Sequence, residues 1–253
     1  TTEIYTLSLH DALPISDMFY ATRELDDSEL PDINTINDYY LIGYSQGGWA
    51  TLALHKALEL EYSDDFNLAG SVCGAGPYDI GLLFSSMVDV YSYPMPVYIG
   101  YIFNAYSVYK QITNPASDIF NEPYASRINT LYDGTKSFEQ INSQLSTSIP
   151  ELLNSSFISG YKISDKYSSV RNAFISNSIE AWHSYKPVLF IHGGSDTQVN
   201  PVTTENIYSE MIQAGTSSDL IRKVIIPDAD HGDGVLPAMI EGIEFLYDLK
   251  KSR

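Results

Sequence analysis

A serine between glycines is the residue of this chain best placed to act as a nucleophile. Ser45 lies in the run Tyr39–Ala50, YYLIGYSQGGWA, in which four β-forming residues are followed at once by Gly-x-Ser-x-Gly and a helix-like segment. A strand, a sharp turn and a helix around such a serine expose its hydroxyl above the strand end. We expect the turn to strain the serine backbone and to bring helix and strand so close that a Cβ on Gly43 or Gly47 would collide. The pattern predicts a nucleophile elbow, Gly43-Tyr44-Ser45-Gln46-Gly47.

An acid and a histidine follow predicted strands later in the chain. Asp196 comes just after the apolar strand 187–192, and His231 just after the strand 222–226. Catalytic groups of open α/β sheets collect at the carboxyl ends of the strands, so the three side chains are expected to lie together. A serine hydroxyl is a weak nucleophile at neutral pH. His231 would therefore take the Ser45 proton, and Asp196 would orient His231.

Other residues of the same types compete for these roles. His55 lies in the helix after the elbow, His183 ends a long insert, and His192 closes a strand, where it fits better as a support for the following loop than as the base. For the acid, Asp228 and Asp233 are plausible substitutes, whereas the adjacent Asp230 points the wrong way for a side-chain pair with His231.

The elbow also predicts one donor of an oxyanion hole. Gln46 is the first residue of the elbow helix, so its backbone N–H is expected to face the developing oxyanion. In folds with such an elbow, earlier strands and the loop that supplies the second donor normally come first, and few residues precede Ser45. We interpret the chain as truncated at its N-terminus.

Composition excludes several classes of protein. The 253 residues carry 14 Lys and Arg against 32 Asp and Glu, a net charge of -18, which argues against nucleic acid or an anionic membrane surface as a partner. No stretch is long and apolar enough to span a bilayer. Cys73 is the single cysteine, so an internal disulfide is excluded, and its apolar surroundings predict a buried thiol.

Segment boundaries follow from the same patterns. Residues 6–15, TLSLHDALPI, resemble one reading frame of a DNA sequencing adaptor, so 1–16 are interpreted as non-native, and His10 and Asp11 as without catalytic meaning. A helix over 17–25 and a polar loop over 26–37 are expected before the elbow. We predict a core from 17–77 and 186–253, with 78–185 as a cap or lid insertion, because a single crossover helix needs only about a dozen residues. The insert's Tyr and Phe side chains suit either an apolar lid or the cap's own core.

The motifs GYSQGGWA, CGAGPYD, VLFIHGGSDTQVNP and DADHGDG resemble those of the α/β-hydrolase superfamily, and most closely the secretory lipases and esterases related to fungal lipase A. The resemblance implies an α/β fold with a mostly parallel sheet and a largely helical cap before the acid-bearing strand. It also implies hydrolysis of small-molecule or lipid esters through an acyl-enzyme, without metal or cofactor, and a secreted or cell-envelope location.

Two rival functions stay open. The same triad serves peptidases and carbohydrate acyl esterases, such as feruloyl or acetyl esterases. A rival of another class is a binding protein that keeps the fold without catalysis, although the presence of all three triad residue types in the expected loops counts against it. The truncation also makes the activity of this chain doubtful, and a panel of esters and amides separates the enzymatic readings.

Overall fold

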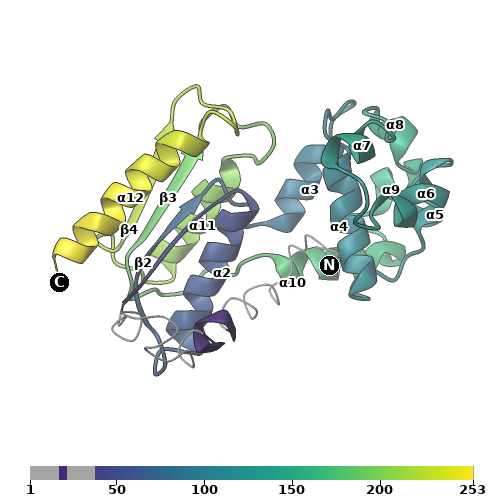
Figure 1. Ribbon diagram of the computed structural model, residues 1–253. Coiled ribbons are helices and arrows are strands. Elements are labelled where there is room, and N and C mark those ends of the chain that lie inside the picture. Colours follow the sequence, from purple (N-terminus) through teal and green to yellow (C-terminus); the bar gives the residue numbers. More distant parts are fainter. Residues whose placement is uncertain (1–16, 22–37, 253) are drawn as a thin grey trace. The chain divides into compact units, whose positions relative to one another are not determined.

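The computed structural model describes residues 17–21 and 38–252 (Figure 1). Within them the chain divides into two compact units. Asp79–Ser178 forms one, and the residues up to Tyr78 together with those from Ile179 onward form the other. The predicted loop 26–37 and the segment 1–16 lie outside the described residues, and of the helix expected over 17–25 the structure describes 17–21, which are helical.

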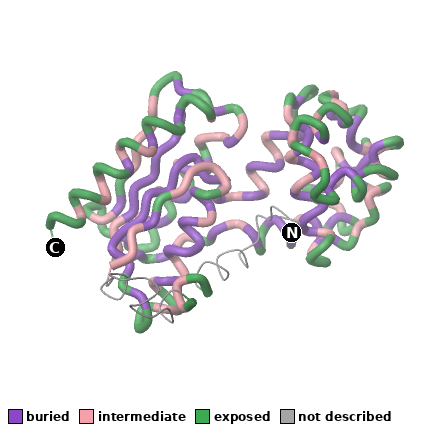
Figure 2. The backbone as a smooth tube through the Cα atoms, viewed as in Figure 1, coloured by how far each residue is buried: buried purple, intermediate pink, exposed green. Residues whose placement is uncertain are grey.

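The second unit is built on a parallel sheet of four strands in the order β1-β2-β3-β4. The strands are β1 (Asp38–Tyr44), β2 (Asn67–Gly74), β3 (Val188–Gly193) and β4 (Ile221–Ile226). Figure 2 shows the central strands β2 and β3 as buried, and all six residues of β3 are buried. Continuous apolar runs are typical of parallel strands covered on both faces, which is why these two were readable from the sequence.

Helices cover both faces of this sheet. They are α2 (Gln46–Leu60), α11 (Val202–Gln213) and α12 (Val235–Lys251). A Cβ on Gly242 of α12 would meet Val72 and Ile42, whereas a Cβ on Gly43 would meet Gly47 and Thr51 at the start of α2. Successive strand residues point to opposite faces, so α12 covers one face of the sheet and α2 the other. The carboxyl ends of the strands are left for loops that can carry polar groups.

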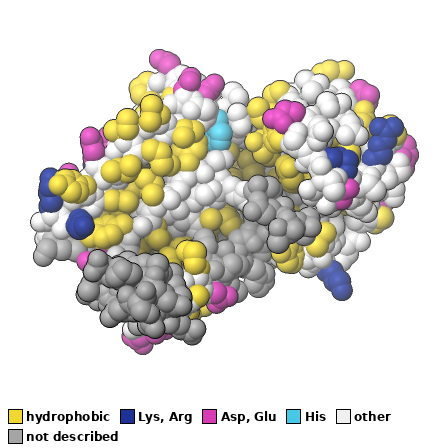
Figure 3. Space-filling model, in the orientation of Figure 1, with side chains coloured by type: hydrophobic (Ala, Val, Ile, Leu, Met, Phe, Trp, Pro, Cys, Tyr) yellow, Lys and Arg dark blue, Asp and Glu magenta, His cyan; other side chains and the backbone are white. Residues whose placement is uncertain are grey.

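The α12 face holds a compact apolar core. Val72, Leu189, Ile191 and Ala238 are buried together, and Tyr44, Val224, Ile226, Phe245 and Leu246 pack against them. The helix also carries apolar side chains outward: Leu236, Ile240, Ile243 and Tyr247 are exposed, and Figure 3 shows hydrophobic side chains gathered over this helix.

The unit Asp79–Ser178 is helical. Its elements are α3 (Ile80–Val88), α4 (Val97–Val108), α5 (Ala116–Ile119), α6 (Tyr124–Leu131), α7 (Phe138–Asn142), α8 (Ile149–Leu152), α9 (Ser155–Gly160), the 3-10 turn η2 (Asp165–Tyr167) and α10 (Ser168–Asn177). Residues 138–153 hold two short helices, and the helix that contains residue 170 ends at Asn177.

The chain leaves the sheet-containing unit and returns to it at one place. The Ile179 N–H donates to the Tyr78 carbonyl at 2.8 Å, so the two connections lie side by side. The returning segment is also tied to α2, because the Trp182 indole N–H donates to the Glu59 carboxylate at 2.8 Å. The two segments that connect the helical unit to the sheet-containing unit are therefore hydrogen-bonded to each other. The returning segment is also bonded to α2, the helix that follows Ser45.

Prolines lie at the start of two helices. α11 begins at Val202, directly after Pro201, and the Asn200 carboxamide oxygen accepts the Val202 N–H at 3.0 Å. α12 begins at Val235, two residues before Pro237. Among residues 17–21 and 38–252, no helix is both long and apolar enough to cross a membrane.

Candidate active site

Ser45 occupies a strained turn between β1 and α2. Its backbone has φ 58° and ψ -124°, in a region that non-glycine residues seldom adopt. The Ser45 N–H donates to the Gly74 carbonyl at 2.8 Å, and the Ser45 carbonyl accepts the Trp49 N–H at 3.1 Å. The turn is therefore held by β2 on one side and by the first helical turn on the other. The strain predicted for this serine is confirmed.

One steric expectation for the elbow glycines is wrong. A Cβ on Gly43 would lie 2.2 Å from the Gly47 carbonyl oxygen, as expected, but a Cβ on Gly47 would meet nothing within 4 Å. The close approach falls one residue later, where a Cβ on Gly48 would lie 2.2 Å from the Gly74 oxygen. Gly48, in the first turn of α2, lies against β2, whereas Gly47 faces open space. The helix therefore touches the neighbouring strand as well as its own.

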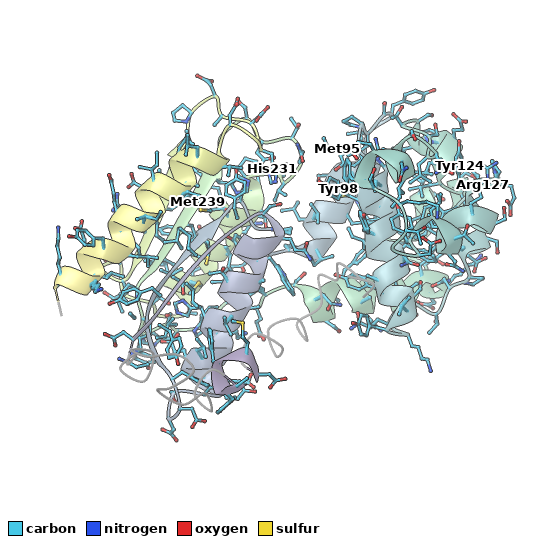
Figure 4. All side chains as sticks on the ribbon, viewed as in Figure 1. Met95, Tyr98, Tyr124, Arg127, His231 and Met239 are labelled. Carbon is cyan, nitrogen blue, oxygen red and sulfur yellow. The ribbon has the colours of Figure 1, made fainter. Side chains whose placement is uncertain are left out.

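The structure brings Ser45, His231 and Asp196 into one hydrogen-bonded chain. The Ser45 Oγ lies 2.9 Å from His231 Nε2, and His231 Nδ1 lies 2.6 Å from Asp196 Oδ2. With Asp196 ionised, Nδ1 carries the proton and Nε2 is free to accept the serine proton. Figure 4 shows His231 in the loop after β4, at the end of the sheet where α12 begins. All three residues belong to the sheet-containing unit.

Backbone contacts between two loops position the acid and the base. A Cβ on Gly193 would lie 2.5 Å from the Ala229 carbonyl oxygen, so only a glycine admits the histidine loop at the end of β3. The Ser195 N–H then donates to that same Ala229 carbonyl at 3.0 Å. These contacts hold Asp196 and His231, which follow different strands, at hydrogen-bond distance.

The Asp196 carboxylate is buried and well supplied with donors. Its Oδ1 accepts the N–H groups of Gln198 and Val199, both at 2.9 Å. Burial alone would raise the pKa of this carboxyl, but hydrogen bonds from His192, His231 and the Val199 N–H outweigh it and hold the pKa well below its usual range. Asp196 is thus a stable carboxylate at neutral pH.

Tyr44, the residue before the nucleophile, links the elbow to the histidine loop. Its hydroxyl donates to the His231 backbone carbonyl at 2.8 Å, and its ring lies 5.3 Å from the imidazole. Burial, followed by the negative charges of Asp196 and Asp230, raises the pKa of Tyr44 to about 12, so the hydroxyl remains a donor. Glycines make room for it: a Cβ on Gly234 would lie 2.5 Å from the hydroxyl oxygen. No motif pointed to this contact.

Among the described histidines, only His231 is hydrogen-bonded to Ser45. His55 is fully buried between the hydroxyls of Ser71 and Ser184, and His183 is exposed and stacks on Tyr185. His192 is fully buried, and its Nε2 lies 2.9 Å from the Val199 carbonyl, within the loop it was expected to support.

Among the described residues, the competing acids form no hydrogen bond or ion pair with the His231 ring. Asp230 Oδ1 accepts the Asp233 N–H at 2.8 Å, and Asp228 has a left-handed backbone, with φ 59°. Among the described carboxylates, it is Asp196 that lies at hydrogen-bond distance from the imidazole.

The donor expected from Gln46 has a suitable place. Gln46 is the first residue of α2, and the first N–H groups of a helix have no intrahelical acceptor. Its N–H therefore remains a candidate for an oxyanion formed at Ser45. Cys73 is buried, and burial raises the pKa of its thiol, so it is a packing residue rather than a nucleophile.

Comparison with solved structures defines the class of fold. A putative hydrolase from Legionella pneumophila superposes with a TM-score of 0.81 at 24% identity, covering 92% of this chain and 62% of its own. The rice cell wall degrading esterase LipA from Xanthomonas oryzae gives 0.75 at 22%, covering 98% and 66%. Candida antarctica lipase A in its closed state gives 0.65 at 14%, covering 85% and 49%. The chain has the α/β-hydrolase fold and spans less than two thirds of each of these three proteins.

Comparison of the sequence with models of protein families identifies the family. Residues 20–231 match the secretory lipase family, so the chain belongs to it, and the predicted kinship with lipases and esterases is confirmed. None of the curated proteins compared with the chain matches it. Membership places the chain in a family of carboxylic-ester hydrolases.

Proposed function

We propose that the protein hydrolyses carboxylic esters through an acyl-enzyme on Ser45. The observation that carries the proposal is the continuous chain from Ser45 Oγ through His231 to Asp196, at 2.9 and 2.6 Å, on a strained elbow. A hydroxyl, an imidazole and a carboxylate in this order are what activation of a serine requires. Membership of the secretory lipase family supports esters as the substrate class.

The first half of the reaction forms the acyl-enzyme. Ser45 Oγ attacks the ester carbonyl carbon while its proton passes to His231 Nε2, and the carbonyl oxygen becomes an oxyanion near the Gln46 N–H. As the tetrahedral intermediate collapses, the bond to the alkoxy group breaks and His231 returns the proton to the leaving alcohol.

Water completes the cycle. It attacks the acyl carbon and gives a proton to His231, the acyl–Oγ bond breaks, and that proton returns to Ser45 as the carboxylic acid leaves. Asp196 stays ionised throughout and stabilises the imidazolium that exists between these transfers, a role its depressed pKa favours.

The helical unit Asp79–Ser178 is assigned here to substrate selection. It is inserted between β2, which follows the elbow helix, and β3, which leads to the acid. Most of its Tyr and Phe side chains are buried in its own core, so the assignment rests on its place in the chain. A secreted or cell-envelope location belongs to the same proposal, since it rests on the family resemblance.

Burst kinetics tests the proposal. With a p-nitrophenyl ester, we expect one equivalent of p-nitrophenol per enzyme in a fast phase before the steady state, and none from Ser45→Ala or His231→Ala. A panel of acyl chain lengths, feruloyl and acetyl sugars and an anilide then separates a lipase or esterase from a carbohydrate acyl esterase and a peptidase. Turnover that survives Ser45→Ala would reject the mechanism, and no turnover on any substrate would favour a binding protein.

A further inference from the structure

A second histidine reaches the carboxylate that orients His231. His192 is the fifth residue of β3, is fully buried, and lies against α11, where the hydroxyl of Thr204 is 2.7 Å from its Nδ1. On the other side of the ring, Nε2 lies 2.9 Å from the Val199 carbonyl oxygen and 3.2 Å from Asp196 Oδ2. Both ring nitrogens therefore have hydrogen-bond partners within the protein, and the side chain is shielded from solvent.

The partners define where the proton of His192 lies. Nε2 faces a carbonyl and a carboxylate, which can only accept, so Nε2 carries the proton. Nδ1 of the neutral ring then accepts a hydrogen bond from the Thr204 hydroxyl, which is its one partner among the described residues and can donate. Thr204 thus holds the imidazole in the tautomer that donates toward Asp196.

These contacts complete the environment of the acid. Asp196 Oδ1 accepts two backbone N–H groups, from Gln198 and Val199, and Oδ2 accepts the His231 N–H at 2.6 Å. His192 Nε2 lies 3.2 Å from the same Oδ2 and shares its proton between that oxygen and the Val199 carbonyl, 2.9 Å away. Donors therefore lie around both carboxylate oxygens and restrict rotation of the group.

We propose that His192 is a positioning residue of the acyl-transfer site, which fixes the orientation of the Asp196 carboxylate that receives His231. The inference rests on the proposed function, since a positioned acid matters only if His231 is the base. His192 itself touches neither Ser45 nor any group that reacts, and it acts through Asp196 alone.

Loss of this donor has a predictable signature. Hydrogen bonds to a charged form favour that form, so without His192 the Asp196–His231 pair takes up a proton at higher pH. The groups that face Asp196 are His192 from β3, His231 and the N–H groups of its own loop, with the neutral Tyr44 hydroxyl of β1 nearby. A destabilised fold would lower the amount of active protein but would leave the midpoint of the acid limb unchanged.

Two amide variants separate the functions of the two ring nitrogens. The amide of His192→Asn reaches about as far as Nδ1, so it can meet Thr204 but not Asp196. The amide of His192→Gln reaches about as far as Nε2 and can still donate to Asp196. His55→Asn and His55→Gln are matched controls, because His55 is equally buried, is bonded to two hydroxyls at 2.8 and 3.1 Å, and has the Glu59 carboxylate 3.4 Å from Nε2.

The experiment measures the second-order rate of fluorophosphonate labelling at Ser45 against pH for the full chain, with thermal melting alongside. We expect His192→Asn to label about 10- to 100-fold more slowly, with its acid midpoint raised by about 1 to 2 pH units, and His192→Gln to recover most of both. Both His55 variants should keep the wild-type midpoint even where they melt earlier.

Each outcome decides a different statement. A wild-type midpoint in His192→Asn, or the same shift in His55→Asn, overturns the role of His192 while leaving the proposed function intact. If His192→Asn does not fold, a shifted midpoint in His192→Gln overturns the role and an unshifted one supports it. A wild-type chain that never labels overturns the proposed function and this inference together.

Discussion

Replacing Tyr44 by Phe removes one hydroxyl from the site and leaves its ring in place. That hydroxyl donates to the His231 carbonyl at 2.8 Å and joins the elbow strand to a loop 187 residues later in the chain. The ring lies across Gly74, where a Cβ would approach it to 2.6 Å, so the aromatic packing is retained in the variant. The substitution therefore tests whether this bond positions the imidazole.

The size of the effect follows from the type of bond. A hydrogen bond between neutral groups contributes about 0.5–1.5 kcal/mol. If the whole of it acts on the placement of His231 in the transition state, kcat falls by about two- to tenfold. The pKa of Tyr44 is about 12, so the hydroxyl is protonated at neutral pH and the ratio of wild-type to variant kcat should be constant over the neutral range. This distinguishes Tyr44 from His192, whose loss shifts the acid limb.

The assay is steady-state hydrolysis of a p-nitrophenyl ester, with thermal melting to follow stability. Tyr132→Phe is the matched control, because its hydroxyl donates to the Val97 carbonyl at 2.7 Å within the other unit. Both variants should lose similar stability, while kcat falls only in Tyr44→Phe. An unchanged kcat in Tyr44→Phe, or an equal fall in both variants, would refute the reasoning.

Three further changes have definite expected results. Asp196→Asn should lower kcat by about 10⁴-fold with little change in KM, because an amide selects the wrong tautomer of His231. Steady-state kinetics on a variant with an unchanged circular dichroism spectrum checks this, and a fall in kcat of less than about tenfold would contradict it. Gly48→Ala should melt several degrees below the wild type, because its Cβ would lie 2.2 Å from the Gly74 oxygen. Gly47→Ala, whose Cβ would meet nothing within 4 Å, should melt at or above the wild-type temperature. The reverse order of melting temperatures would refute the contacts described for α2. Burial raises the pKa of Glu59, but bonds from His55, Trp182 and the Tyr185 N–H lower it to about 2. Glu59→Gln, whose amide keeps part of these bonds, should therefore lower the free energy of unfolding at pH 7 by about 1–2 kcal/mol. A lowered folded-state pKa stabilises above the unfolded value and is lost as pH falls, so in urea titrations the difference from wild type should shrink between about pH 4.5 and pH 2; a difference independent of pH would contradict the assignment.

Much of the sheet and its loops could be predicted because the relevant information is local. VLFI is an uninterrupted apolar run, and with His192 and Gly193 it forms the fully buried β3 that leads to Asp196. The elbow could be predicted for the same reason, since a strand, Gly-x-Ser-x-Gly and a helix are contiguous. Parallel strands then bring their carboxyl ends to one edge, which is why residues as distant as Ser45 and His231 could be expected to lie together.

What could not be predicted depends on contacts between distant segments. The assignment of the second tight glycine to Gly47 instead of Gly48 was wrong because the obstacle is Gly74, on the neighbouring strand rather than on the elbow's own. The bond from Tyr44 to the His231 carbonyl leaves no mark in the motif. His192 was expected to support its loop, but its contact with Asp196 and its dependence on Thr204 require α11 to lie against β3.

The helical unit was predicted least well. Residues 82–103, which are rich in large apolar side chains, form most of α3 and α4 with Asp89–Pro96 between them, yet so many apolar positions leave no clear helical period. Its later helices are only four to ten residues long, from α5 to α10, and such short helices depend on packing rather than on intrinsic preference.

The most direct test of the central claim is the intact mass of the chain after reaction with a fluorophosphonate, followed by mapping of the modified peptide. The account predicts one adduct per chain on Ser45, absent from Ser45→Ala and strongly slowed in His231→Ala. A wild-type chain that stays unmodified, or an adduct that persists in Ser45→Ala, would contradict the assignment of Ser45 as a nucleophile activated by His231 and Asp196.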